Sequence, residues 1–223
     1  PDDRAVWESG VALWQAMASA PQAVHPIEAA FLVAAVLQAR GEAVEFVTDG
    51  AGVQTPVLLT RTRLGVRHAG QVVELLAAQP MQQPVPVPAA KAAAWWLTVR
   101  AHAHRSQAQF PQTRSNLAAA LAMSPDLPAA TFALGVTDVD QGMADKGVPA
   151  CEAALARQDD PLARLFLVDV AMALDQPVKA LQRADEVLKS HPQLAEAHVT
   201  KGILQLQRMA TVPEAQKAPL LTE

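Results

Sequence analysis

The stretch LFLVDVAMALDQPVKALQRADEVLKSHP, residues 165–192, decides the fold of the C-terminal half of this chain. This stretch ends with a helix-favouring triplet, and the residue three positions after the triplet suits the end of a helix. The same arrangement occurs at three places: Ala120-Leu121-Ala122 with Pro125, Ala154-Leu155-Ala156 with Asp159, and Val187-Leu188-Lys189 with Pro192. The spacing of the closing positions is 159 − 125 = 34 and then 192 − 159 = 33. Such a period is typical of stacked helix–turn–helix units, so we predict three units and a shortened fourth unit that ends in residues 210–223.

These units resemble the tetratricopeptide repeat over about residues 91–223. That family places a small residue in the first helix of each unit, where a neighbouring helix crosses closely, and Gly135 and Gly202 occupy this position. Ala180 supplies the small residue expected early in a second helix, whereas the aromatic residue of the first helix is missing throughout. The resemblance implies a solenoid with a concave groove that holds a peptide or a helix of a partner.

The resemblance also implies which side chains line that groove, because the first helix of each unit faces inward in this family. The exposed candidates for partner binding are Arg100, His104, Thr137, Asp138, Arg164, Lys201 and Gln205. A clamp for a carboxylate terminus needs several converging basic groups, and Arg100, Arg164 and Lys201 could form part of one. The alternative is an ordinary solvated face of mixed charge.

A proline-rich segment over residues 79–90 divides the chain. Its core reads QPMQQPVPVP over residues 79–88, and prolines at alternate positions remove backbone donors and disfavour helix. We therefore predict an extended linker between a small domain at 1–78 and the repeats at 91–223. A loop inside one domain is the alternative.

The first half mixes helical and strand patterns. A helix is predicted over residues 6–17, and a second from Pro26 to a stop at Gly41. Alternation over 43–47 favours a strand, and the β-rich runs 57–66 and 71–76 favour a hairpin that turns at 68–70. The predicted fold class is therefore mainly α: a small α+β domain with two helices and an antiparallel hairpin, followed by a helical-repeat solenoid.

Residues 24–76 also resemble a transglutaminase-like domain. In that family a catalytic cysteine opens a helix, but His25, Pro26 and Ile27 occupy that place here. His68 stands where the family histidine is expected. Without a thiolate the nucleophilic step has no agent, so the resemblance implies an inactive relative. A transglutaminase-like or peptidase-like hydrolase with another nucleophile is the alternative function.

Composition excludes several classes of protein. Among 223 residues, 51% are hydrophobic and the formal net charge is −4, with no dense basic block, so nucleic acid is not an expected partner. No apolar run reaches the roughly 20 residues that a membrane span needs. The chain begins at Pro1 rather than at a methionine. We therefore expect a preceding piece, which a signal, a membrane anchor or a cloning artefact would explain equally.

Metal and cofactor motifs are weak. His102 and His104 are two positions apart, which on a helix turns them to different faces. The run from Asp138 to Gly142 resembles the start of a calcium loop but has Pro149 at the twelfth position, where glutamate is needed. The single cysteine, Cys151, is predicted to be a small core residue. We expect neither metal nor cofactor.

These patterns together predict a scaffold rather than an enzyme. The expected function is binding of another protein through the concave face of the repeats, within a bacterial multiprotein assembly. Alanine and proline usage suggests the bacterial source, and leaves the cytoplasm and the periplasm equally open. A purely structural subunit of a larger assembly is a further alternative.

Overall fold

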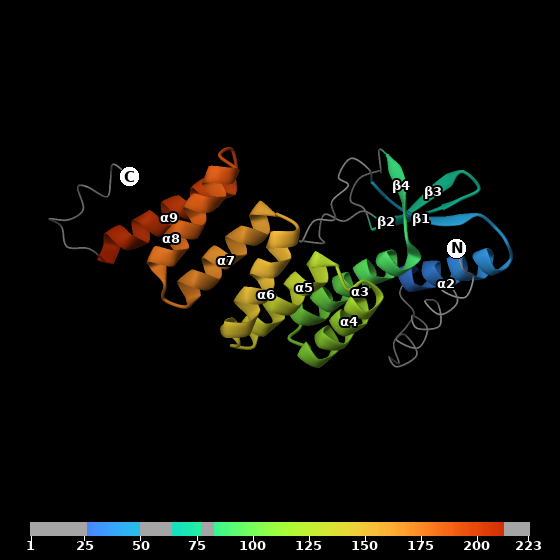
Figure 1. The fold of residues 1–223 in the computed structure, drawn as a ribbon, viewed down its shortest axis with the longest axis horizontal. Helices are drawn as coiled ribbons and strands as arrows, with labels where there is room; N and C mark the ends of the chain where they lie inside the picture. Colours follow the sequence, from blue (N-terminus) through green and yellow to red (C-terminus); the bar gives the residue numbers. More distant parts are fainter. Residues whose placement is uncertain (1–25, 50–63, 77–82, 212–223) are drawn as a thin grey trace. The chain divides into compact units, whose positions relative to one another are not determined.

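The computed structural model describes residues 26–49, 64–76 and 83–211, which fall in two compact units, 1–158 and 159–223. The described residues are mainly helical, with eight helices and a small four-stranded antiparallel sheet (Figure 1). The helix predicted over residues 6–17 and the end of the shortened fourth unit, residues 212–223, lie outside the described residues.

The sheet belongs to the first unit and has the strand order β3-β2-β1-β4. Its strands are β1 (Val44–Asp49), β2 (Leu64–His68), β3 (Gln71–Leu76) and β4 (Pro84–Val87), and all neighbours pair antiparallel. Ala69 and Gly70 join β2 to β3 with φ of 50° and 78°, the left-handed pair that tight hairpins favour. The predicted first strand and the predicted hairpin turn are confirmed, while residues 57–63 lie outside the described part.

Strand β4 corrects the predicted linker. Residues 84–87 pair with β1, with Val85 opposite Thr48 and Val87 opposite Phe46. Strand β4 lies at the edge of the sheet and has a neighbouring strand on one side only. Pro84 and Pro86, which lack an N–H group, are therefore tolerated, because no second strand needs hydrogen bonds from them. The alternating prolines therefore mark an edge strand, and the boundary between the compact units comes after Gln158 instead.

Helix α2 (Pro26–Ala39) packs on this sheet. The rings of Phe31 and Phe46 stack with their centroids 4.5 Å apart. Gly41 has φ of 80°, and the Glu42 N–H donates to the Leu37 carbonyl at 3.0 Å, so the helix ends in a left-handed cap as predicted.

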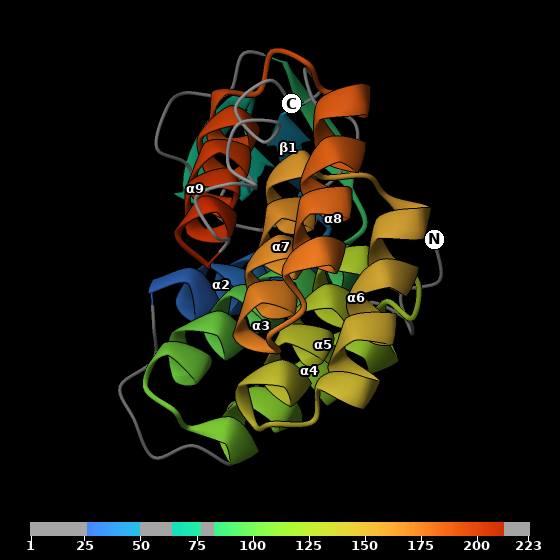
Figure 2. The same ribbon diagram turned by 90° about the vertical axis from the view of Figure 1, so that its left-hand side faces the viewer.

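The remaining helices follow one another along the chain. The first unit contains α3 (Ala89–Ser106), α4 (Phe110–Met123), α5 (Pro128–Asp140) and α6 (Ala144–Arg157). The second contains α7 (Pro161–Ala173), α8 (Pro177–Ser190) and α9 (Ala195–Thr211), and α8 contacts both α7 and α9. Figure 2 shows α7 and α8 side by side. Asp160 caps α7 by accepting hydrogen bonds from the Leu162 and Ala163 N–H groups.

The same turn closes three helical hairpins: α3 with α4, α5 with α6, and α7 with α8. Its central residue is left-handed in each: Ala108, Gly142 and Asp175, with φ of 55°, 78° and 55°. The next N–H donates to the carbonyl five positions back, as from Met143 to Asp138 at 2.8 Å. The glycine at 142 signals this turn in the sequence, whereas Ala108 gives no such signal.

Helices α5 and α6 cross in close contact at two glycines, Gly135 and Gly147. A Cβ built on Gly135 would lie 2.7 Å from both the Gly147 carbonyl oxygen and the Cys151 Sγ. The predicted close crossing at Gly135 is therefore confirmed. At Gly202 on α9, an added Cβ would meet nothing within 4 Å, so no close crossing occurs there in the described structure.

Candidate functional site

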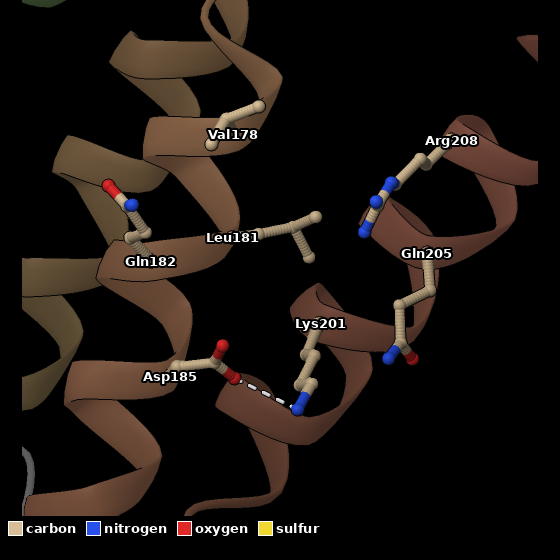
Figure 3. A pocket seen from close by; sticks show the side chains of 7 residues that line it. All are labelled: Val178, Leu181, Gln182, Asp185, Lys201, Gln205 and Arg208. Carbon is tan, nitrogen blue, oxygen red and sulfur yellow. Dashed lines mark ion pairs between the residues drawn. The ribbon is translucent and has the colours of Figure 1, made fainter. Parts of the chain in front are cut away.

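A pocket of about 420 Å³ lies between α8 and α9 in the second unit (Figure 3). Its lining residues are Val178, Leu181, Gln182, Asp185, Lys201, Gln205 and Arg208. All seven come from described helices, so the pocket is a feature of this unit alone.

The spacing of these residues along α8 and α9 explains why their side chains line the pocket. On α8 the lining residues are spaced i, i+3, i+4 and i+7 from Val178, which is one face of a helix. The neighbouring face of α8 carries Ala180, Ala184 and Val187, which are buried in the core of the unit. On α9 the pocket face has the spacing i, i+4 and i+7 from Lys201, while Leu204 is buried. Each helix thus packs with one face and leaves the adjoining face to line the pocket.

The pocket combines aliphatic and charged groups. Leu181 points from α8 towards α9, and Val178 has 68% of its surface exposed (Figure 3). The Lys201 Nζ lies 2.9 Å from the Asp185 Oδ1 at one end, and Arg208 stands on the same helix further along (Figure 3). The lining therefore contains two cations and one carboxylate, which gives the pocket wall a net positive charge.

Two of the predicted groove residues, Lys201 and Gln205, line this pocket. Arg164, expected to join them, lies near the start of α7 and forms an ion pair with Asp159 instead. Reasoning from the sequence missed Arg208, one turn beyond Gln205 on α9. It also missed all four α8 residues, because it considered first helices only. The i, i+3, i+7 spacing of Val178, Leu181 and Asp185 beside an alanine-rich face is a signal that could have found them.

The predicted candidates in the first unit make contacts within the fold. Asp138, whose side chain is only 13% exposed, forms an ion pair with Arg114. The His104 Nδ1 lies 2.6 Å from the Gln109 Oε1 in the turn that follows α3. Thr137 was predicted to be exposed but is buried, and its hydroxyl donates to the Ala133 carbonyl at 2.7 Å. Arg100 is half-buried on α3.

His68, the histidine of the hydrolase alternative, is the last residue of β2. Its Nε2 lies 2.7 Å from the Glu42 Oε2, and both side chains are 42% exposed. It stands beside the Ala69–Gly70 turn that connects β2 to β3. This position differs from the enclosed pocket, with nucleophile and orienting carboxylate, that the alternative requires.

The Cys151 thiol is buried where α5 and α6 cross, as predicted for a core residue. Burial raises the pKa of the thiol to about 12, with smaller contributions from Glu152 and Asp138. The thiol therefore stays protonated near neutral pH, and a protonated thiol is not a nucleophile.

The two histidines of α3 have different partners. His102 Nδ1 faces the Arg105 guanidinium at 3.5 Å, and burial followed by that positive charge lowers the pKa of His102. His104 contacts Gln109 instead. In the part of the chain that the structure describes, no three His, Cys, Asp or Glu side chains are grouped to hold a metal ion.

Comparison with known proteins finds no family model that matches this chain and no similar sequence among curated proteins. Among the helices of the described residues, none has the length and apolar character needed to cross a membrane.

Proposed function

We propose that this chain is a protein-interaction scaffold whose helical hairpins bind a segment of another protein. The observation that carries the proposal is the open pocket between α8 and α9, where exposed aliphatic and cationic side chains occur together. Binding sites typically combine an apolar lining with a few convergent polar groups.

A tetratricopeptide-type array is the architecture that we propose for the helical part. Helices α5, α7 and α9 begin at Pro128, Pro161 and Ala195, so the spacing of their starts is 161 − 128 = 33 and 195 − 161 = 34. The left-handed turns at Ala108, Gly142 and Asp175 recur with the same period. In this proposal Lys201 and Gln205 contribute to a concave binding face, and the partner belongs to a bacterial multiprotein assembly.

Binding is proposed rather than catalysis on chemical grounds. A catalytic site needs a nucleophile beside a base, in a setting that excludes water. Cys151 is buried and protonated, and His68 pairs with Glu42 on an exposed end of the sheet. The α8–α9 pocket offers instead groups that recognise a ligand through charge, amide hydrogen bonds and aliphatic contact.

The test is affinity capture with the full chain, followed by calorimetric titration of the purified partner. A double variant, Lys201→Glu with Arg208→Glu, should weaken binding by at least about tenfold, since it reverses both cations of the pocket. The matched control is Lys146→Glu with Lys179→Glu, which makes the same charge change at exposed positions in first helical turns that tolerate acids. Failure of the purified chain to bind any protein above a blank resin would contradict the proposal.

A further inference from the structure

Helix α9 carries an exposed apolar stripe on the side away from the core of its unit. The stripe consists of four residues: Val199, Gly202, Ile203 and Leu206. Its three aliphatic side chains are 61%, 51% and 67% exposed, in that order, and an added Cβ on Gly202 would meet nothing within 4 Å. The spacing i, i+3, i+4 and i+7 places all four on one helical face, while Ala197 and Leu204 on another face are buried. The α9 stripe is therefore a continuous apolar face without a packing partner in the described structure.

The same positions on α5 are covered by a helix. Helix α5 begins at Pro128 and α9 at Ala195, so the two are offset by 67 (195 − 128). The counterparts of the α9 stripe are Phe132, Gly135, Val136 and Val139, of which the first three are buried. An added Cβ on Gly135 would lie 2.7 Å from the carbonyl oxygen of Gly147 on α6, and one on Gly147 would lie 2.7 Å from the Val139 Cγ2. This face of α5 thus packs tightly against α6.

Helix α7 follows the same plan. Its start at Pro161 precedes that of α9 by 34 (195 − 161), so the counterparts of the stripe are Leu165, Val168, Asp169 and Met172. Leu165 and Val168 are buried in a core that includes Ala180 of α8, and Met172 packs against that core. Asp169 is the exposed member of the four. In both earlier hairpins, the second helix therefore lies against the face that α9 exposes.

Helix α9 continues past the point at which the earlier first helices turn back. The left-handed turn residues Gly142 and Asp175 correspond, at offsets of 67 and 34, to Met209. Met209 lies within α9, which extends to Thr211. In the part of the chain that the structure describes, no turn at this point brings a second helix onto the α9 stripe.

We infer that the α9 stripe pairs with the same stripe of a second copy of this chain. The two α9 helices lie antiparallel about a two-fold axis midway between positions 202 and 203, which is also midway between 199 and 206. Each Ile203 then faces the partner's Gly202, and each Val199 faces the partner's Leu206. The largest gap on the stripe thus receives the β-branched side chain next to it in the other copy, so the face is complementary to itself.

Charge favours a second copy in this orientation. The stripe itself is uncharged, while α9 has Glu196 in its first turn and Arg208 in its last turn. Antiparallel pairing brings each end of the helix towards the end of opposite charge in the other copy, whereas parallel pairing brings like charges together. Arg208 keeps the interaction that it has within its own chain, since the pairing requires no new ion pair.

The size of the stripe sets the strength of the dimer. A standard interface buries roughly 800 Å² per partner, and three partly exposed side chains on one helix supply less than that. We expect a reversible dimer with a Kd on the order of 10–100 μM. Lys201, which lines the α8–α9 pocket, is two positions from Val199 and lies on a different face, so the dimer leaves the pocket open. The inference therefore goes beyond the proposed function and does not depend on it.

Sedimentation equilibrium of the full chain tests whether the dimer forms. From about 1 to about 500 μM, the average mass should rise from 23.6 kDa towards twice that value. Ile203→Glu should raise the Kd at least about tenfold, because it places two carboxylates at the axis. The matched control, Val178→Glu, makes the same change at an aliphatic residue of α8 that is 68% exposed, and it should dimerise normally. A chain that stays monomeric over this range, or equal weakening by both variants, would overturn the inference.

Disulfide cross-linking tests the orientation with two exposed-site variants, Val199→Cys and Leu206→Cys. In the antiparallel dimer an oxidised mixture of the two should give a linked dimer on a non-reducing gel. Neither variant should link to itself, because copies of one position lie about 10 Å apart along the helix axis, and a disulfide spans Cα atoms up to about 7 Å apart. The buried Cys151 is common to both variants, and the unchanged chain is its control. Linking of each variant with itself would indicate parallel pairing, and no link in the mixture would place the contact elsewhere, so either result overturns the inference.

Discussion

Gly135 and Gly147 bring the backbones of α5 and α6 into direct contact, because neither carries a Cβ at the crossing. A Cβ on Gly135 would stand 2.7 Å from the Gly147 carbonyl oxygen, which belongs to the backbone and cannot rotate away. The crossing also encloses the Cys151 Sγ on the same side. The packing of this hairpin therefore depends on the absence of two methyl groups.

Gly135→Ala should destabilise the first unit by about 2 kcal/mol or more, because the added methyl group forces α5 and α6 apart. The matched control is Gly202→Ala on α9, where the added Cβ meets nothing within 4 Å. There the gain in helix propensity should stabilise by up to about 1 kcal/mol. Urea unfolding followed by circular dichroism measures both, and equal midpoints for the two variants would show that the crossing is not tight.

Much of the helical half could be predicted from local sequence. The repeat period, the cap at Asp160 and the close crossing at Gly135 depend on residues whose local chemistry is distinctive. The predicted linker failed for a different reason. Alternating prolines are compatible with both an extended linker and an edge strand, and only the pairing of Val85 and Val87 with β1 decides between them.

The candidate site was harder to predict, because it depends on contacts between helices. Lys201 and Gln205 were predicted from their positions on a first helix, and they line the pocket. The same reasoning also selected Asp138, which instead pairs with Arg114 across the α4–α5 junction. Thr137 is buried by packing that its own helix does not reveal. Which face of a helix remains open is a property of its neighbours, and a periodic pattern on one helix does not contain it.

Asp160→Ala should cost about 1 kcal/mol of stability in the second unit, because two N–H groups at the start of α7 lose their acceptor. The control is Asp126→Ala, whose carboxylate is 98% exposed and 3.7 Å from the Arg157 guanidinium. That change should alter stability by less than about 0.5 kcal/mol. Comparable losses for both variants in urea unfolding would argue against a capping role for Asp160.

Arg114→Leu should destabilise the first unit by about 1–2 kcal/mol, since Asp138 is mostly buried and loses the cation that balances it. The arginine is itself 37% exposed, which limits the loss. A double-mutant cycle with Asp138→Asn isolates the pair. A coupling energy near zero in that cycle would mean that the bridge closes the α4–α5 junction without stabilising it.

The buried thiol of Cys151 should make the protein less stable at alkaline pH. Burial raises the pKa of this thiol from 9.0 to about 12, so between these values the unfolded chain loses a proton that the native chain retains. In that range the native state binds more protons than the unfolded state, so the free energy of unfolding should fall by up to about 1.4 kcal/mol per pH unit. Below pH 9.0 the protonated thiol makes its full contribution to stability. The Cys151→Ala variant lacks the thiol ionisation but keeps every lysine. Its urea midpoints should therefore fall less steeply from about pH 8 to 10.5 than those of the unchanged protein. Parallel curves for the two proteins would mean that the native thiol ionises with its ordinary pKa.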